Sequence, residues 1–575
     1  MIKKLLYFFN KRQKKSLLLL FGFMFVATIL EMVGLGFVFS IVGVLNPVIA
    51  EDNIFINKLG SFLQLDKTEI ILYLLLSFLF FYIFKIIFLV FYNWYENIFL
   101  YSYKEYLSSK VFKEYLNQNF SYFYNRNSSE FLRNLITEVD HFYLYLVSFL
   151  KLILEIVVVI GIFCLLAYIN LYFATLVSII FLLISSLYFF LIKEKLNIWG
   201  TQRQSNIQKR IQFMQEGFDG IKIIKLLGRE NFFFSKFKTY NINLFKVSMK
   251  AEFFQRMPRL LLELVGISFI TFSLLILYYS GTNLIAIAQI LCVYVAASFR
   301  ILPSINRIVT ALQHMKLSYP AMHVLYDEQK NFKKETTLPH KKFSFNNNIF
   351  VDIKKFKYPN SNNFEISDIK LNILKGQKIG IIGSSGSGKS TVVEILTGIS
   401  EQPEGSITVD GKSIFSNMRG WQNLIGFVPQ KIFILDDSLR NNILFGLDNN
   451  KYLDDQIILI IKKLSLENLL KRLPNGLDGN LGEEGINLSG GEIQRIGLCR
   501  ALIYDPEILF LDEATSSLDI NTESQILDEL KVFKEKTIIS VAHRINTLKN
   551  CDKIFCFDKG KVVDQGNFDK FRMQN

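Results

Sequence analysis

Cysteine is scarce in this chain: 5 of its 575 residues are cysteine, and none has the spacing of a zinc ligand set. A cleavable secretory signal is not expected either, because the first apolar run is about twice as long as a signal h-region and lacks a small-residue cleavage site. The sequence therefore argues against a zinc domain and a removable leader. The cysteines are expected to be small hydrophobic core residues, at Cys164, Cys292, Cys499, Cys551 and Cys556.

Residues 383–391 read GSSGSGKST, which matches the phosphate-binding pattern G-x-x-x-x-G-K-[ST]. An apolar run at 379–382 precedes this loop and a helix-like run at 391–396 follows it, which is the strand–loop–helix setting that such a loop requires. Backbone N–H groups and the helix dipole would hold the phosphates, Lys389 would reach the β- and γ-phosphates, and the Ser390 hydroxyl would ligate Mg²⁺. The expected phosphate-binding residues are Gly383, Ser384, Gly386, Ser387, Gly388, Lys389, Ser390 and Thr391.

A second motif, LSGGEIQ at 488–494, resembles the signature of ATP-binding-cassette (ABC) ATPases. The resemblance covers roughly residues 345–575 and implies ATP as the nucleotide and Mg²⁺ as its cofactor. In that family the signature faces away from its own phosphate loop and completes the site of a second cassette. Since this chain has one copy of each motif, the resemblance implies a symmetric homodimer in which Ser489, Gly490 and Gly491 contact ATP held by the partner.

The rest of the cassette pattern implies roles for residues elsewhere in the C-terminal part. Asp512, at the end of the apolar run 508–512, would hold Mg²⁺ together with Ser390 and Gln430. An intact Glu513 at the general-base position favours turnover over a nucleotide-gated channel or sensor. Tyr358 stands where the family stacks an aromatic ring on adenine. Each motif alone has an ordinary structural alternative, and their order and spacing together favour the cassette. The expected catalytic residues are Lys389, Gln430, Glu513 and His543.

Half of the chain is hydrophobic (50%), and several apolar runs reach the length of about 20 residues that a bilayer crossing requires. They lie at roughly 16–46, 70–99, 143–169, 171–192, 259–280 and 284–310. The expected fold is an all-α six-helix transmembrane domain at 1–318, a linker at 319–344, and an α/β phosphate-loop ABC ATPase domain at 345–575.

Lysine and arginine mark the expected orientation of these spans. Six basic residues precede the first span, the loops after spans two and four are long and basic, and the connector after span one carries more acid than base. Both termini and the cassette are therefore expected in the cytoplasm, and the absence of a transit peptide favours a bacterial inner membrane. The net charge of +14 is then a membrane-surface property and requires no nucleic acid partner. The basic N-terminal segment with Leu5, Leu6, Phe8 and Phe9 is expected to be a helix lying at the membrane interface.

Six spans followed by one cassette resemble the half-transporter of ABC exporters. Residues 121–125 (SYFYN) and 216–230 resemble the two cytoplasmic coupling segments of such exporters, whose short helices dock on cassettes, usually on that of the partner. The alternative is that both segments are merely amphipathic helices.

Basic residues also fall inside or at the edge of the expected spans, at Lys85, Arg259, Arg300 and Arg307. A cation that faces lipid near the bilayer centre costs about 2.5–3.5 kcal/mol. We therefore expect these side chains to face a wet cavity and to bind an anionic part of the substrate, for which pyrophosphate is the natural candidate. Two alternatives stay open: Arg259 and Glu263 could form a structural pair, and Arg259 and Arg307 could extend to the cytoplasmic interface.

The stretch 298–307, SFRILPSINR, resembles bacterial flippases that move undecaprenyl-pyrophosphate-linked oligosaccharides for protein glycosylation. The resemblance implies ATP-driven movement of an amphipathic, lipid-linked anionic substrate from the cytoplasmic to the outer leaflet of the lipid bilayer. An amphipathic segment at 54–65 could hold the polyprenyl tail or could simply rest on the bilayer. Exporters of drugs, peptides or other lipids would share every cassette residue, although peptide export with processing is disfavoured because no peptidase domain fits before residue 16.

Overall fold

The computed structural model describes residues 2–45, 67–124, 126–169, 171–279, 284–332, 343–358, 365–447, 454–514 and 518–572. The chain divides into two compact units. Residues 1–118 and 126–333 form a helical unit, and residues 119–125 and 334–575 form a second unit that contains the sheets. The segment at 54–65, a candidate for tail binding, lies outside the described residues.

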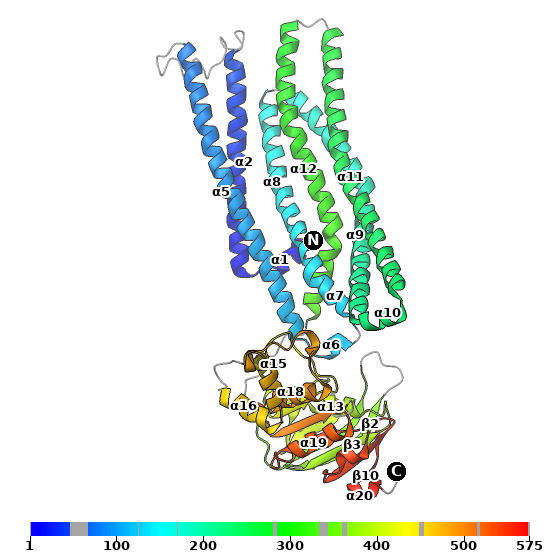
Figure 1. Ribbon diagram of the computed structural model, residues 1–575. Coiled ribbons are helices and arrows are strands. Elements are labelled where there is room, and N and C mark those ends of the chain that lie inside the picture. Colours follow the sequence, from blue (N-terminus) through cyan, green and yellow to red (C-terminus); the bar gives the residue numbers. More distant parts are fainter. Residues whose placement is uncertain are drawn as a thin grey trace. The chain divides into compact units, whose positions relative to one another are not determined.

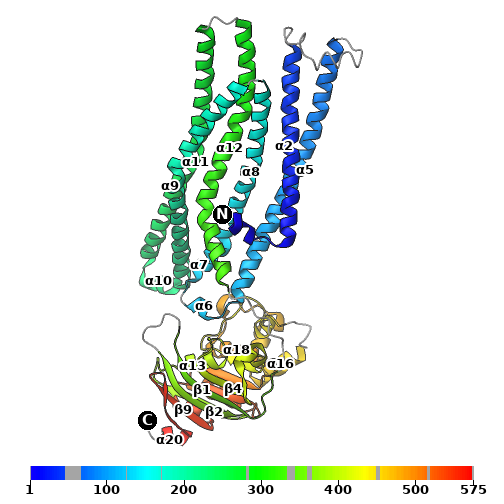
Figure 2. The same ribbon diagram turned by 180° about the vertical axis from the view of Figure 1, so that it is seen from behind.

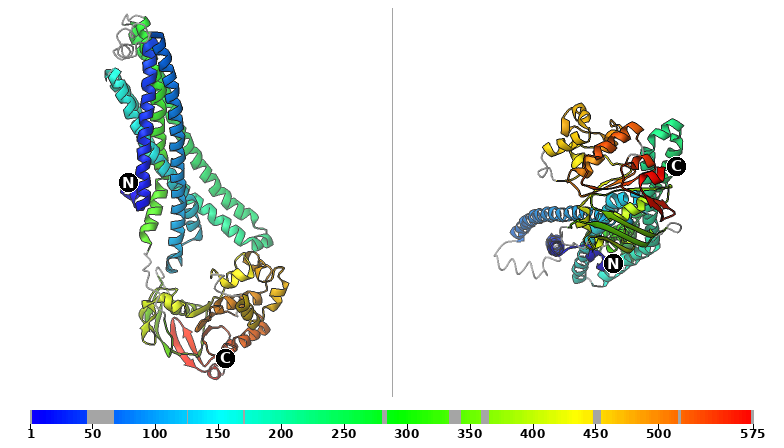
Figure 3. Two further views of the ribbon diagram at one scale, coloured as in Figure 1. Left: turned by 90° about the vertical axis from the view of Figure 1, so that its left-hand side faces the viewer. Right: turned by 90° about the horizontal axis from the view of Figure 1, so that it is seen from below.

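Long helices build the first unit (Figures 1 and 2). They are α2 (Lys11–Leu45), α5 (Lys67–Leu116), α8 (Val139–Ile169), α9 (Leu171–Asp219), α11 (Glu230–Tyr279) and α12 (Leu284–Asn331). α2 packs against α5, α11 packs against α9 and α12, and α12 also packs against α8 and α9. Figure 3 shows α2 and α5 running side by side.

Shorter helices join the long ones. They are α1 (Ile2–Tyr7), α6 (Ser121–Tyr124), α7 (Ser128–Arg133), the π-helical turn η1 (Asn134–Glu138) and α10 (Ile221–Leu227). α6 and α10 fall in the two segments that were expected to be coupling helices. α6 belongs to the second unit, although it lies between α5 and α7 in the chain.

Some of the described helices of the first unit have the length and composition of membrane spans. Among the described residues, four helical stretches pass that test: Lys11–Gly34, Leu75–Leu116, Ser128–Ala167 and Ala174–Asp219. They correspond to the first four expected spans, and the expected spans at 259–280 and 284–310 coincide with parts of α11 and α12. Large apolar side chains such as Phe80, Ile87 and Leu183 are 69%, 64% and 61% exposed. Exposure on this scale suits contact with lipid.

The N-terminal segment packs against the long helices of the first unit. α1 is helical, but Leu5, Phe8 and Phe9 are buried inside the protein. The ring of Phe8 lies 4.6 Å from that of Phe142 in α8, and the ring of Phe9 lies 4.6 Å from that of Tyr103 in α5, centroid to centroid. Aromatic surface is stabilised by this packing, so one face of the segment packs on the long helices of its own unit.

α12 also extends beyond the limit that the sequence suggested. A linker was expected from residue 319, but the helix continues to Asn331. Ala321, Met322 and Leu325 are fully buried at helical spacing. One continuous apolar face therefore keeps the chain helical where its polar composition suggested a linker.

Two sheets build the second unit. The larger has the strand order β10-β9-β3-β8-β7-β6, in which the neighbours from β9 to β6 pair in parallel and β10 is antiparallel. The smaller sheet, β2-β1-β4-β5, is antiparallel. The strands are β1 (Asn348–Phe356), β2 (Ile366–Leu374), β3 (Lys378–Gly383), β4 (Glu404–Val409), β5 (Lys412–Ser413), β6 (Ile425–Val428), β7 (Ile508–Asp512), β8 (Thr537–Val541), β9 (Lys553–Asp558) and β10 (Lys561–Gly566).

Helices cover the larger sheet, and β7 is buried at every position, as a strand inside a parallel sheet requires. The helices are α13 (Lys389–Leu396), α14 (Met418–Gln422), α15 (Leu439–Leu444), α16 (Asp454–Lys463), α17 (Glu467–Arg472), α18 (Gly490–Leu502), α19 (Ile520–Leu530) and α20 (Phe568–Arg572), with 3₁₀ turns η2 (Ile414–Ser416), η4 (Gly476–Asp478), η5 (Glu483–Gly485) and η6 (Ile545–Leu548). The observed class, a helical unit followed by an α/β unit, agrees with the expected one.

Candidate functional site

The expected phosphate-binding loop connects β3 to α13. Because β3, β8 and β7 are parallel neighbours, the loops that leave the carboxyl ends of β3 and β7 meet at one edge of the sheet. Gly388, just before α13, has a φ of 103°, a conformation that glycine adopts without strain. The Lys389 side chain is buried, and its Nζ donates to the carbonyl oxygens of Gly383 and Ser384 at 3.0 Å each. The lysine thus closes the loop on itself at the place expected for phosphates.

A cavity of about 410 Å³ opens at this loop. Burial lowers the pKa of Lys389, while the negative charges of Glu513 and Asp512 oppose that shift. A partly desolvated ammonium group beside backbone N–H groups suits a polyphosphate ligand. The cavity is lined by Tyr124, Tyr358, Ser385, Gly386, Gly388, Lys389, Ser390, Thr391, Gln430, Glu513 and His543.

Two of the three expected Mg²⁺ ligands lie together. The Ser390 hydroxyl donates to Asp512 Oδ1 at 3.2 Å, and burial raises the pKa of Asp512. A hydroxyl and a carboxylate are hard oxygen ligands of the kind that Mg²⁺ prefers, so the pair fits the ion. Gln430, the third expected ligand, instead donates from Nε2 to Glu513 Oε2 at 2.7 Å. Within the ranges that the structure describes, no group of three or more His, Cys, Asp and Glu forms a metal cluster.

Glu513 occupies the centre of the expected catalytic group. It follows β7 directly, is 8% exposed, and has a φ of 49°, in the left-handed region that non-glycine residues seldom adopt. Gln430 contacts one carboxylate oxygen of Glu513, and His543 Nε2 lies 2.6 Å from the other, Oε1. Glu513, Gln430 and His543, three of the expected catalytic residues, therefore form one cluster.

Tyr358, the expected adenine platform, is fixed by a residue that sequence reasoning missed. Its hydroxyl donates to the carboxylate of Glu394 in α13, and burial together with this hydrogen bond raises the pKa of Tyr358. Glu394 also accepts from the Ser400 hydroxyl at 3.1 Å. No motif marks Glu394; the fact that it lies on the helix that follows the phosphate loop is the signal that could have singled it out.

The signature residues lie apart from this cavity. Ser489 caps α18 in a capping box: its side chain accepts from the Glu492 N–H at 3.3 Å, and its own N–H donates to Glu492 at 2.7 Å. Ser489 and Gly490 are exposed, and in the described part of the chain neither they nor Gly491 line the phosphate-loop cavity. The phosphate loop and the signature of one chain thus do not form a single site.

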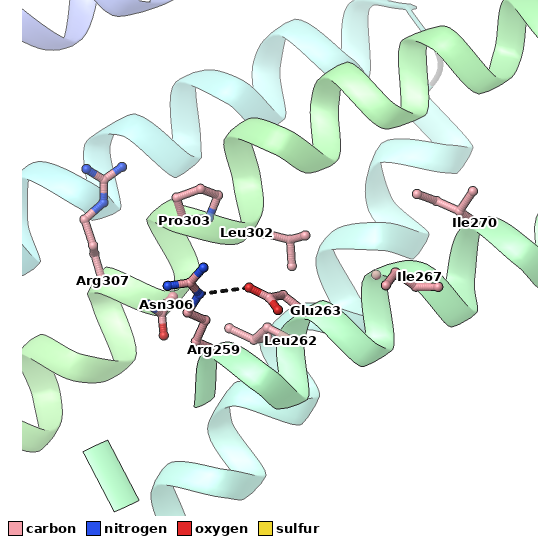
Figure 4. A pocket seen from close by; sticks show the side chains of 10 residues that line it. Arg259, Leu262, Glu263, Ile267, Ile270, Leu302, Pro303, Asn306 and Arg307 are labelled. Carbon is pink, nitrogen blue, oxygen red and sulfur yellow. Dashed lines mark hydrogen bonds and ion pairs between the residues drawn. The ribbon is translucent and has the colours of Figure 1, made fainter. Parts of the chain in front are cut away.

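A second cavity, of about 780 Å³, lies in the helical unit between α11 and α12 and contains two of the four expected intramembrane cations. Figure 4 shows Arg259 paired with Glu263, with Arg307 extending away from that pair. Arg259 Nε lies 2.9 Å from Glu263 Oε1, and Arg307 Nε lies 2.9 Å from Glu155 Oε1 on α8. The ion-pair alternative is therefore observed for Arg259, and Arg307 is paired as well. Apolar side chains such as Leu262, Ile267 and Leu302 form the rest of the wall.

The other two expected cations are placed differently. The Lys85 ammonium lies 4.9 Å from the centre of the Tyr82 ring on the same helix, close to where a side chain at Gly34 would lie. Lys85 is not among the residues that line the cavity between α11 and α12. Arg300 belongs to α12, and its side chain lies outside the described part of the structure.

Two family models match the chain. The model described as ABC transporter matches residues 366–516, and the model described as ABC transporter transmembrane region matches residues 17–299. Each unit thus matches a model of an ABC transporter domain. The expected order, a membrane-spanning region followed by an ATP-binding cassette as in a half-transporter, is confirmed.

Known proteins are similar to parts of this chain. An export ATP-binding/permease protein of Rickettsia bellii is 38% identical over 225 residues, which cover 38% of this chain and 39% of that protein. An ATP-dependent lipid A-core flippase of Alkalilimnicola ehrlichii is 27% identical over 379 residues, 63% of this chain and 62% of that protein. These matches span less than two thirds of either relative. The solved structure of a bacterial Atm1-family ABC exporter with ATP bound shares the fold, with a TM-score of 0.81 at 18% identity over 99% of this chain and 97% of that one.

Proposed function

We propose that this chain is one half of an ATP-driven exporter, and that two copies hydrolyse ATP to move an amphipathic anionic substrate across the membrane. The observation that carries the proposal is the arrangement at the phosphate-loop cavity. There, a buried lysine, a carboxylate in the position of a base and a histidine line one space of about 410 Å³.

The residues of this cavity have different roles in ATP hydrolysis. Lys389 binds the phosphates, and a Mg²⁺ ion held by Ser390 and Asp512 would neutralise charge on the β- and γ-phosphates. Glu513 accepts a proton from the attacking water. Before that step, Gln430 and His543 exchange their hydrogen bonds to Glu513 for bonds to the water and to the γ-phosphate.

A second copy completes the site in this proposal. The exposed first turn of α18 holds Ser489, Gly490 and Gly491 outside the cavity of their own chain. A helix N-terminus with free N–H groups is suited to phosphate, and a symmetric pair of chains would bring each such terminus to the cavity of the partner. The simplest assembly is therefore a homodimer.

The substrate proposed is a polyprenyl-pyrophosphate-linked oligosaccharide, moved from the cytoplasmic to the outer leaflet of a bacterial inner membrane with both termini and the cassette in the cytoplasm. The cavity between α11 and α12 supports an amphipathic substrate, because an apolar wall is combined with Arg259 and Arg307. Both guanidinium groups are held by carboxylates at 2.9 Å, so the pyrophosphate would compete with Glu263 and Glu155 for them. Export of drugs, peptides or other lipids is the alternative, and the relative named as a lipid A-core flippase is in keeping with a lipid.

Stimulation of ATP hydrolysis by defined lipids tests this substrate class. Undecaprenyl-pyrophosphate-linked oligosaccharide should raise the ATPase rate of the reconstituted protein, and a neutral polyprenol should not. Arg259→Ala should abolish the stimulation and leave the basal rate unchanged. The matched control is Arg256→Ala, which removes an exposed arginine of the same helix that is paired with Glu252 at 2.8 Å outside the lining of the cavity.

Arg307 needs a gentler substitution, because Glu155 is 5% exposed and would be left as an unpaired buried carboxylate after truncation. Arg307→Lys keeps the charge and removes the planar fork, so stimulation should weaken while the melting temperature changes little. Equal stimulation in wild type, Arg259→Ala and Arg256→Ala would overturn the assignment of the cavity. Parallel loss of stimulation, basal ATPase and thermal stability would show that these arginines only hold the helices together.

A further inference from the structure

The place expected for adenine is taken by another aromatic ring of the same chain. Tyr124, the last residue of α6, stacks on Tyr358 with ring centroids 4.8 Å apart and an angle of 5° between the ring planes. Both tyrosines line the phosphate-loop cavity. The ring of Tyr124 thus covers one face of Tyr358 in this cavity.

Tyr358 is held on its other sides. Its hydroxyl is bonded to Glu394, and Phe356 contacts its ring edge-on, with centroids 5.2 Å apart and an angle of 80° between the planes. The face covered by Tyr124 is one on which a planar base could stack. Tyr124 itself is 53% exposed, so its ring can leave this position with little rearrangement of the core.

α6 lies against the cassette at a second point. The Ser121 hydroxyl donates to Glu401 Oε1 at 3.1 Å, and residues 119–125 belong to the same compact unit as the cassette. The hydrogen bond of Ser121 and the stacked ring of Tyr124 thus both place the helix beside the nucleotide cavity. Loss of the stack leaves Ser121 in place and frees the end of the helix that carries Tyr124.

We propose that Tyr124 occupies the adenine position on Tyr358 in the nucleotide-free protein, and that nucleotide binding displaces it. This rests on the proposed ATP site and goes beyond it, because it makes a residue of the predicted coupling helix a direct competitor of the base. Two rings cannot stack on one face of Tyr358 together, so each molecule of nucleotide bound releases the tip of α6. An aromatic pair is worth about 2- to 10-fold in an equilibrium constant, and binding of the base carries that cost.

The direction in which Tyr124→Ala changes the affinity for ADP shows whether Tyr124 competes with the base or helps to bind it. In the full-length protein, Tyr124→Ala should tighten the binding of ADP by about 2- to 10-fold, since the competitor is gone. Affinity for inorganic pyrophosphate, which has no base, should stay the same. Tyr124→Phe keeps the ring and should bind ADP like the wild type. The control Tyr122→Ala, on the same helix and outside the cavity lining, should also match the wild type.

A second set of variants removes the ring of Tyr358, on which the base is proposed to stack. Tyr358→Ala should weaken ADP binding, and adding Tyr124→Ala to it should produce no further change. Weaker or unchanged ADP binding by Tyr124→Ala alone would overturn the proposal, since a base held between both rings predicts weakening. Lys389→Ala tests the ATP site separately from the role of Tyr124. Loss of ADP binding in Lys389→Ala supports the ATP site whatever Tyr124 does. A wild type that binds no ADP would refute both the ATP site and the role of Tyr124.

Discussion

Both carboxylate oxygens of Glu513, the proposed base, are engaged by neighbouring side chains. Its two carboxylate oxygens are contacted at 2.7 Å by Gln430 and at 2.6 Å by His543, and its backbone has a φ of 49°. A strained backbone at a functional residue persists only where the surrounding structure holds it. The geometry thus places Glu513 in the phosphate-loop cavity and engages both of its carboxylate oxygens, which nucleotide and water would have to free.

Replacing Glu513 by glutamine tests the role of this carboxylate. Glu513→Gln should keep ATP binding and reduce hydrolysis by about 10²-fold or more, because the amide cannot accept the proton of the attacking water. ATP turnover and ATP affinity of the full-length protein are the measurements. Glu507→Gln is the matched control, a partly exposed cassette carboxylate paired with Lys375 at 2.8 Å. Turnover near the wild-type rate in Glu513→Gln would remove this residue from the role of base.

For single residues, the sequence predicted which motif residues line the cavity, but it did not predict the side chains that contact Tyr358. The phosphate-loop motif and the resemblance to ABC ATPases predicted that Lys389, Ser390 and Glu513 belong to one site, and all three line the same cavity. Glu394 and Tyr124 were not predicted as site residues. Their contacts with Tyr358 arise from tertiary packing, and neither contact leaves a fixed spacing in the sequence.

Among the elements, the π-helical turn η1 between α7 and α8 carries a buried charge cluster. Glu138 is 0% exposed and accepts from Gln204 Nε2 at 2.8 Å, with Arg203 Nη2 at 3.4 Å and Arg133 Nε at 3.7 Å. Two buried arginines thus share one carboxylate. The cluster ties η1 and α7 to α9, and a π-helical turn of this kind often marks a functional position.

Removing the shared carboxylate should destabilise this junction strongly. Glu138→Ala leaves Arg133 and Arg203 buried without their counter-charge, which costs about 3–5 kcal/mol for a buried pair. A large fall in the melting temperature of the purified protein is the expected outcome. Glu230→Ala, which breaks an exposed pair with Lys225 in the same unit, should leave the melting temperature nearly unchanged. Equal melting temperatures for the two variants would contradict the account of the cluster.

The sequence predicted that helices form where apolar runs are long, but it did not predict the residues at which those helices begin and end. The six expected spans each coincide with a long helix or part of one, because about 20 apolar residues are a strong signal. The packing of α1 and the residue at which α12 ends depend on contacts with residues elsewhere in the chain. Phe8 faces Phe142 of α8, and Met322 is fully buried, so packing decided both outcomes against the composition of the local sequence.

For the whole molecule, the separation of the signature from the phosphate loop predicts a site shared by two copies. A dimer of one Lys389→Ala chain and one Ser489→Asp chain keeps one intact site only if each site uses residues of both chains. Aspartate still caps α18 but repels the γ-phosphate. Dimers of this mixed kind, isolated with two different tags, should therefore hydrolyse ATP while each variant alone does not.

The matched control carries the same two changes in one chain. A dimer of wild type and the double variant Lys389→Ala/Ser489→Asp has both shared sites damaged and should be inactive. The two mixtures give opposite results if each chain builds its site alone. Activity in the second mixture and none in the first would therefore contradict the shared site.

ATP-dependent movement of a labelled lipid tests the central claim most directly. A fluorescent polyprenyl-pyrophosphate-linked oligosaccharide is placed in proteoliposomes that contain the full-length chain, and the fraction of label in each leaflet is followed with a membrane-impermeant quencher. The account predicts that ATP drives the label away from the leaflet on the cassette side in the wild type, and that Glu513→Gln liposomes show no such movement. Unchanged distribution in a wild type that hydrolyses ATP, or equal movement without ATP, would contradict it.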